Sequence, residues 1–170
     1  HTLELYYQQQ IIATREILDG ARKLAVDSRY GLVFIHFPVP HSPFIHHRAW
    51  WDQFPKGYAD NLALCDQILG QIRKDMESKG VWEDTNIIIS SDHSYRDSEK
   101  FDGKKDQRVP FMVKLANQEE AIVYSKKFNT VLTHDLVLDI LSKKVTTPAE
   151  IVHWLELHEG NCQNITKSGQ

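Results

Sequence analysis

The chain has 170 residues, of which 41% are hydrophobic and 25% charged, an ordinary composition for one globular domain with a core of its own. Its formal net charge is −3 and its acidic and basic residues are interspersed, so no clustered basic face indicates nucleic-acid binding. No stretch approaches the roughly 20 consecutive apolar residues that span a bilayer, and the first residues lack the basic start and apolar run of a signal peptide.

The first half of the chain alternates between helical and extended patterns. Residues 5–26 and 58–79 place apolar side chains at spacings of three and four, which predicts two amphipathic helices. Between them, residues 31–36 form a short apolar run typical of a buried strand, and residues 37–57 hold four prolines, which predicts a long loop. Residues 86–91 are the next apolar strand. Strand, helix and strand in this order predict a parallel, right-handed βαβ unit.

The second half begins with a polar loop and ends in helices. Residues 109–115 predict a third strand and residues 121–125 a short fourth one. Residues 130–143 and 148–157 again have helical spacing. The whole pattern predicts an α/β fold with a mostly parallel sheet and helices on both of its faces.

Domain organisation follows from the same pass along the chain. We expect one domain over residues 1–160 and a polar tail over residues 161–170, since no repeat or low-complexity linker interrupts the pattern. Because the chain starts with His rather than Met, we also expect it to be part of a longer protein.

Two of the predicted strands end in side chains that suit a metal or an anion. His36 and His41 flank the end of the first, and Asp92 and His93 follow the strand at residues 86–91. Ligands of open α/β sheets bind beyond the carboxyl ends of the strands, and carboxylate and imidazole groups are good ligands for zinc and manganese. Taken alone, however, an adjacent Asp-His pair is typical of a loop-entry aspartate beside a solvated histidine.

Four motifs occur in an order that resembles the alkaline-phosphatase and sulfatase superfamily. The first is a strand ending in Pro-His-Ser-Pro at residues 40–43. The second is a helix followed, at residues 83–94, by Glu-Asp-Thr-Asn, an apolar strand and Ser-Asp-His-Ser. The others are Val-Pro-Phe at residues 109–111 and Thr-His-Asp-Leu at residues 133–136. The resemblance extends over residues 32–141 and implies the α/β/α sandwich of that superfamily.

The resemblance implies roles for three residues. Asp92 and His93 match two metal ligands, and His41 matches a histidine that contacts the phosphate or sulfate group of the substrate. The implied cofactor is a divalent metal, Mn²⁺, Zn²⁺ or Ca²⁺, bound weakly or not at all by this chain alone, since two ligands are a partial set. His36 has no match, and His134 is expected either to neighbour the site or only to flank a helix.

Departures from the superfamily pattern limit what the chain does by itself. Ser94 replaces the Gly that usually follows Asp-His. The superfamily nucleophile, a Thr, Ser or modified Cys, precedes the matched portion, and neither Cys65 nor Cys162 begins the sulfatase signature Cys-x-Pro-x-Arg. We therefore expect an upstream half of the domain as the partner of this chain, and we expect the chain alone to be a poor catalyst or none.

The function implied for the complete protein is that of a metal-dependent hydrolase or transferase acting on sulfate or phosphate esters. Related headgroup transferases are membrane-anchored, so we expect an extracytoplasmic location. The alternative is a non-catalytic remnant or fragment that keeps the fold and at most weak metal binding. The sequence does not distinguish sulfate from phosphate. Because a half-domain exposes sheet edges, we expect some self-association, which light scattering over a range of concentrations tests.

Overall fold

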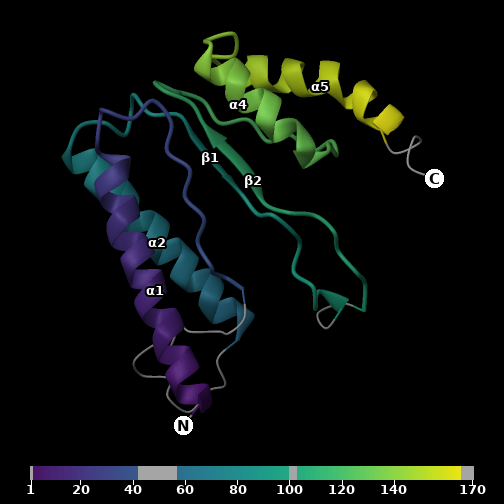
Figure 1. Cartoon of the computed structure of the whole chain (residues 1–170). Coiled ribbons are helices and arrows are strands. Elements are labelled where there is room, and N and C mark those ends of the chain that lie inside the picture. Colours follow the sequence, from purple (N-terminus) through teal and green to yellow (C-terminus); the bar gives the residue numbers. More distant parts are fainter. Residues whose placement is uncertain (1, 42–56, 100–102, 166–170) are drawn as a thin grey trace. The chain divides into compact units, whose positions relative to one another are not determined.

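The computed structural model describes residues 2–41, 57–99 and 103–165 (Figure 1). The chain divides into two compact units, His1–Trp82 and Glu83–Gln170. Side chains are described for residues 4–41, 57–99 and 103–158.

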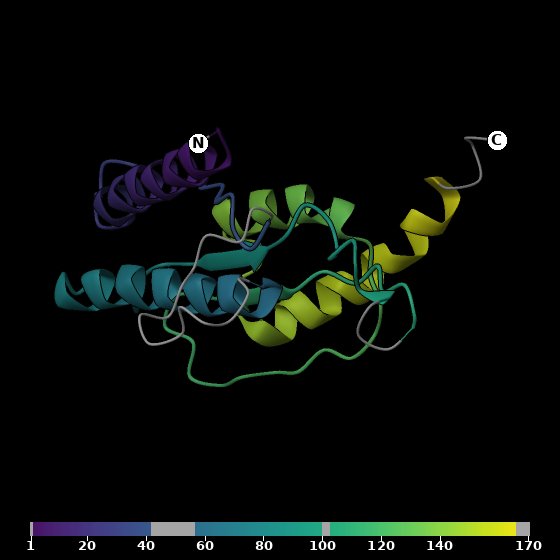
Figure 2. The same ribbon diagram turned by 90° about the horizontal axis from the view of Figure 1, so that it is seen from below.

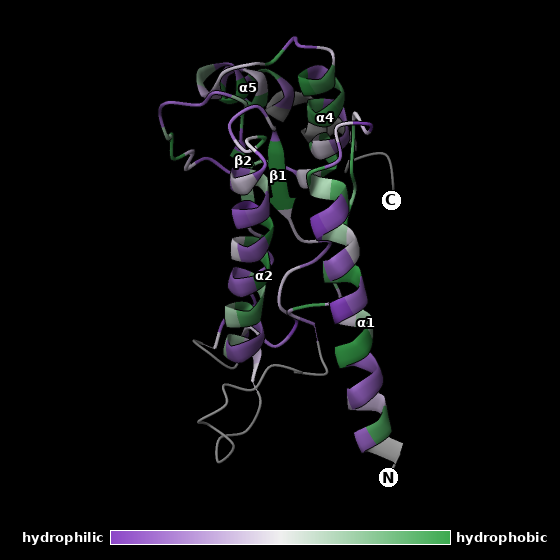
Figure 3. Ribbon diagram, turned by 90° about the vertical axis from the view of Figure 1, so that its left-hand side faces the viewer, coloured by the Kyte–Doolittle hydropathy of each residue, from purple (hydrophilic) through white to green (hydrophobic). Residues whose placement is uncertain are grey.

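The first unit is built on two helices that pack side by side, α1 (Thr2–Ala25) and α2 (Tyr58–Ser78) (Figures 1 and 3). Both predicted helices are thus confirmed, with ends that differ by at most three residues. The Asp60 carboxylate accepts a hydrogen bond from the backbone N–H of Gly57 at the start of α2, and Gly80 lies just beyond its end at φ +69°, a conformation that favours glycine. No helix in the described part of the chain is long and apolar enough to cross a membrane.

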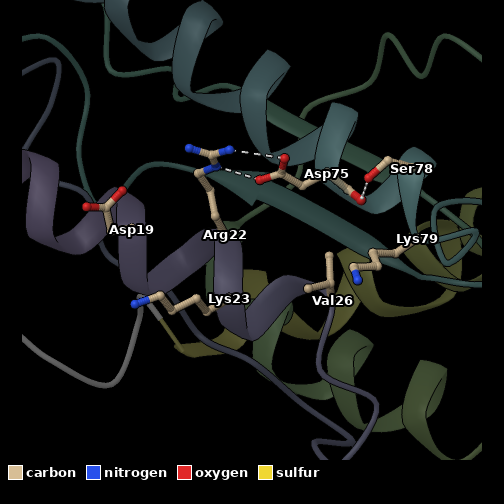
Figure 4. A pocket seen from close by; sticks show the side chains of 7 residues that line it. All are labelled: Asp19, Arg22, Lys23, Val26, Asp75, Ser78 and Lys79. Atoms are coloured by element: carbon tan, nitrogen blue, oxygen red, sulfur yellow. Dashed lines mark hydrogen bonds and ion pairs between the residues drawn. The ribbon is translucent and has the colours of Figure 1, made fainter.

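An ion pair joins the two helices near their C-terminal ends. The guanidinium of Arg22 in α1 donates two hydrogen bonds to the carboxylate of Asp75 in α2, with Nη2 3.1 Å from Oδ1. Figure 4 shows this pair in a pocket of about 330 Å³ that Lys23 and Lys79 also line. None of the residues that the sequence predicts for the functional site lies in this pocket. We therefore interpret the pair as a link between the helices.

This link predicts a particular dependence of stability on pH. The hydrogen bond from Arg22 lowers the pKa of Asp75 below its ordinary value, so the pair stabilises the folded state above the unfolded-state pKa, and this stabilisation is lost as pH falls through the lowered folded-state pKa. In urea unfolding at pH 5 and pH 3, Arg22→Met should show a smaller loss of stability on acidification than the wild type. The matched control is Arg15→Met, which removes an exposed arginine of the same helix. An equal loss in all three proteins would contradict the prediction.

The second unit contains a two-stranded sheet of β1 (Ile87–Ser90) and β2 (Phe111–Lys114). The strands are antiparallel, with Ile88 opposite Val113 and Ser90 opposite Phe111. Figure 3 shows β1 in the green of hydrophobic residues. Ile88, Phe111 and Val113 share one face of the sheet, because residues opposite each other or two apart in a strand point the same way, and this face packs against the hydrophobic core.

The mostly parallel sheet expected from the sequence is not seen in the described residues, whose one strand pair is antiparallel. A parallel neighbour needs a crossover that returns the chain to the opposite end of the sheet. Here the last residue of β1 lies opposite the first residue of β2, so the loop between the strands leaves and re-enters the sheet at the same end. The fold class is therefore α/β with a small antiparallel sheet.

The strands predicted for residues 31–36 and 121–125 are also wrong, since neither segment is in a strand among the residues described. Residues 31–36 were predicted to be a buried strand because they are apolar, and residues 121–125 were predicted to be a short fourth strand. Phe34 is 88% exposed and Val123 93% exposed. An apolar segment forms a strand only when a neighbouring strand pairs with it, and apolar composition alone does not predict such a neighbour. Without strand 31–36, the described residues do not form the predicted βαβ unit.

Helices complete the second unit: η1 (Thr130–Leu132), α4 (Thr133–Leu141) and α5 (Pro148–Ile165), seen from two directions in Figures 1 and 2. They confirm the two helices predicted there, although α5 continues eight residues past its predicted end at residue 157. Trp154 of α5 donates an indole hydrogen bond to Asp139 of α4 at 2.8 Å. The buried members of the core are Leu115, Leu132, Leu136, Ile140, Val145, Ile151, Trp154 and Leu155.

Candidate active site

The Asp92-His93 pair lies where β1 ends. Ser90 is the last strand residue, and the next residues leave the sheet in a loop that returns at Phe111. β1 consists of three isoleucines and Ser90, and the polar residues from Ser91 onward lie outside the strand. The sequence prediction that the pair follows a strand is therefore confirmed.

The hydrogen bonds of His93 determine its tautomer. Its Nδ1 lies 2.7 Å from the backbone oxygen of Ser94. A carbonyl oxygen only accepts hydrogen bonds, so Nδ1 carries the proton and, in the neutral ring, Nε2 carries the lone pair. Metal-binding histidines commonly have their second ring nitrogen fixed by a hydrogen bond of this kind. The imidazole thus has the protonation pattern of a ligand that binds through Nε2.

Asp92 and His93 are close enough to face a common cation. The Nε2 atom of His93 is 4.0 Å from Oδ2 of Asp92, and tetrahedral zinc with ligand bonds of about 2.0–2.2 Å holds two donor atoms about 3.4 Å apart, so a small side-chain movement would let both atoms bind one ion. The Asp92 side chain is 72% exposed, which leaves its carboxylate accessible to an ion from solution. The structure therefore brings these two predicted site residues together.

Ser91 is a neighbour of the pair that was not predicted for the site. Its hydroxyl donates a hydrogen bond to the backbone oxygen of His93 at 2.8 Å. Together with the bond to Ser94, this contact holds both the backbone and the ring of His93. The signal in the sequence was a short polar side chain just before the Asp92-His93 pair, since such residues commonly form hydrogen bonds with nearby backbone.

The donor set fits a divalent cation in part. One carboxylate and one imidazole suit zinc or manganese, whereas calcium takes oxygen ligands and matches an imidazole poorly. Within the described residues, no group of three or more His, Cys, Asp or Glu side chains is arranged to hold a metal. Among the described residues, Asp92 and His93 are therefore at most two donors of a metal site that would need further ligands.

His41 belongs to the first unit. Its side chain is exposed, and its backbone oxygen accepts a hydrogen bond from the side-chain amide of Asn61 in α2 at 3.2 Å. The same amide nitrogen lies 3.4 Å from the backbone oxygen of Pro40. Asn61 was not predicted as a site residue. The sequence does contain one indication of its burial: Asn61 precedes Ile68 by seven positions, about two helical turns, so the two residues share one face of α2. Both are buried.

The other histidines singled out from the sequence have ordinary surroundings. His36 is exposed. His134 lies at the start of α4, exposed, with Nδ1 2.8 Å from the carboxylate of Asp135. Of the two expectations for His134, its surroundings favour a residue that flanks a helix.

Comparison with known proteins identifies the family. Residues 6–151 match the family of type I phosphodiesterases and nucleotide pyrophosphatases. The chain belongs to this family. The family is a member of the alkaline-phosphatase superfamily, so the resemblance stated from the four motifs is confirmed. No curated protein and no solved structure gives a significant match. His41, Asn61 and the Asp92-His93 pair all fall within the matched residues.

Proposed function

We propose that this chain is part of a metal-dependent hydrolase of phosphate esters, in which Asp92 and His93 bind a divalent cation and His41 contacts the phosphoryl group. One observation carries the proposal. An aspartate and a histidine with its lone pair on Nε2 lie 4.0 Å apart directly after β1, within residues matched by a family of phosphodiesterases and pyrophosphatases.

The chemistry of these groups fits the proposal. A bound divalent cation would act as a Lewis acid that polarises a phosphoryl oxygen. His41 would donate a hydrogen bond to charge that develops on the transferring group. Its backbone is held beside the first turn of α2, where the helix dipole favours a nearby anion. The chain's own residues thus bind the metal and orient the phosphoryl group.

Family membership favours phosphate esters over the sulfate esters that the sequence left open, and binding of the two anions tests this. With Mn²⁺ present, calorimetry should show that inorganic phosphate binds more tightly than sulfate. His41→Ala should weaken phosphate binding at least tenfold, or about 1.4 kcal/mol. The control is His153→Ala, which removes an exposed histidine of α5 and should leave binding unchanged.

The outcomes of this experiment distinguish a phosphate-ester enzyme from a sulfate-ester enzyme and from the non-catalytic alternative. Sulfate binding as tight as phosphate binding would favour a sulfate-ester enzyme. Absence of both would contradict the proposal and favour the non-catalytic alternative. Phosphate binding that His41→Ala leaves intact would remove His41 from the site but leave the metal ligands in place.

A further inference from the structure

We propose that Asn61 is a positioning residue that holds the backbone at His41 so that the imidazole is presented to phosphate. The inference rests on the function proposed above for His41. Asn61 lies in the first turn of α2, and its side chain is 0% exposed. It is the most deeply buried polar residue among those described in the first unit.

The contacts of Asn61 point to the segment before α2. Its Nδ2 atom donates to the backbone oxygens of His41 at 3.2 Å and Pro40 at 3.4 Å. An amide nitrogen carries two N–H donors and a carbonyl only accepts, so these contacts fix the amide with its nitrogen toward the Pro40–His41 backbone. Two consecutive peptide oxygens are therefore held by one rigid side chain.

The cost of burying this group shows that the contact is specific. A buried amide without hydrogen bonds costs several times more free energy than one that is satisfied. Asparagine is also a poor helix former, because its side chain competes for backbone hydrogen bonds. Next to it, Asp60 caps the helix start by accepting a hydrogen bond from the backbone N–H of Gly57. Asn61 instead donates to the backbone oxygens of Pro40 and His41, a contact that satisfies its buried amide nitrogen.

Holding the backbone of His41 limits where its imidazole can lie. The backbone oxygen is three bonds from the Cβ atom, so fixing the peptide restricts the ring to the few staggered rotamers of that backbone. Residues that preorganise a binding group reduce the entropy lost when the ligand binds. Loosening the segment should therefore weaken phosphate binding without removing any group that touches phosphate.

The decisive variant is Asn61→Asp, which keeps the shape of the side chain and replaces both N–H donors with acceptors. The control is Asn86→Asp, the same chemical change at a residue whose side-chain oxygen, kept in the variant, accepts from the N–H of Ala116. We would record the ring resonances of His41 by NMR during a titration with inorganic phosphate in the presence of Mg²⁺, which is diamagnetic. Circular dichroism of each protein would report helix content.

We expect Asn61→Asp to move the His41 ring resonances toward unfolded values and to raise the Kd for phosphate at least tenfold, while Asn86→Asp matches the wild type. Unchanged His41 resonances and an unchanged Kd would overturn the inference. If Asn61→Asp loses helix content, the smaller neutral variant Asn61→Ser, which keeps one donor, decides: an intermediate Kd supports the inference and a wild-type Kd overturns it.

Failure of the proposed function gives a different result. If the wild type does not respond to phosphate at His41 but Asn61→Asp still shifts the His41 resonances, the positioning of His41 stands and its phosphate-binding role fails. If the wild type responds and Asn61→Asp responds equally well, only the positioning role fails.

Discussion

Replacing Asp92 with alanine should weaken Mn²⁺ binding at least tenfold, equivalent to about 1.4 kcal/mol, as measured by calorimetry on the chain and the variant. The physical reason is that Asp92 supplies the only carboxylate that the described structure places within 4.0 Å of His93 Nε2. Removing it leaves a single imidazole, and one ligand retains a divalent ion poorly. Zn²⁺ should show the same loss, since it takes the same two donor types.

The chain contains a matched control for this substitution. Asp135 is also an exposed aspartate beside a histidine, but its carboxylate is 2.8 Å from Nδ1 of His134, and both residues lie on a helix. Asp135→Ala should leave the affinity for Mn²⁺ unchanged. Equal losses in the two variants would mean that the metal responds to general negative charge, and the assignment of Asp92 as a ligand would be wrong.

Replacing Leu136 with alanine should lower the free energy of unfolding by about 2–5 kcal/mol, the range for a large core residue that leaves a cavity. Leu136 is 1% exposed and packs in the core shared by α4, α5 and β2. Urea unfolding followed by circular dichroism measures the change. Leu138 is the control, since it lies on the same helix but is 51% exposed, and Leu138→Ala should change the stability by less than about 0.5 kcal/mol apart from its helix propensity. Similar losses in both variants would contradict the described core.

The helices were predictable because their evidence is local. In α2, the spacing of apolar residues gave both the helix and its approximate ends. It did not give the buried face completely: Leu62, Leu69 and Met76 all follow the apolar spacing, but only Met76 is buried. The other buried residues of α2 are Asn61 and Ile68. Counting apolar residues alone misses a polar residue that is buried for a specific contact, as Asn61 is.

Strand pairing was the least predictable part of the fold, because it depends on residues far apart in the sequence. Phe34 has the same apolar surroundings in sequence as Ile88, yet only Ile88 lies in a strand. Pairing of Ile88 with Val113 requires a loop that returns the chain to the same end of the sheet. Nothing in the local pattern of either strand specifies whether the pairing is parallel or antiparallel. The antiparallel pairing therefore had to come from the structure.

The candidate site was also only partly predictable from the sequence. Asp92 and His93 were found from sequence because they are adjacent and follow an apolar strand. The contacts that orient them were not, since the hydrogen bonds of His93 to Ser91 and Ser94 depend on the path of the loop. Asn61 was missed because its contact with His41 joins residues 20 positions apart.

The most direct test of the central claim, that Asp92 and His93 bind a divalent metal, is a substoichiometric Mn²⁺ titration followed by NMR of the histidine rings. A bound paramagnetic ion broadens the resonances of its own ligand first. We predict that His93 broadens at the lowest Mn²⁺ concentrations, before His134, His153 and His158 of the same unit. Broadening of His134 or His153 ahead of His93, or of all four together, would contradict the claim.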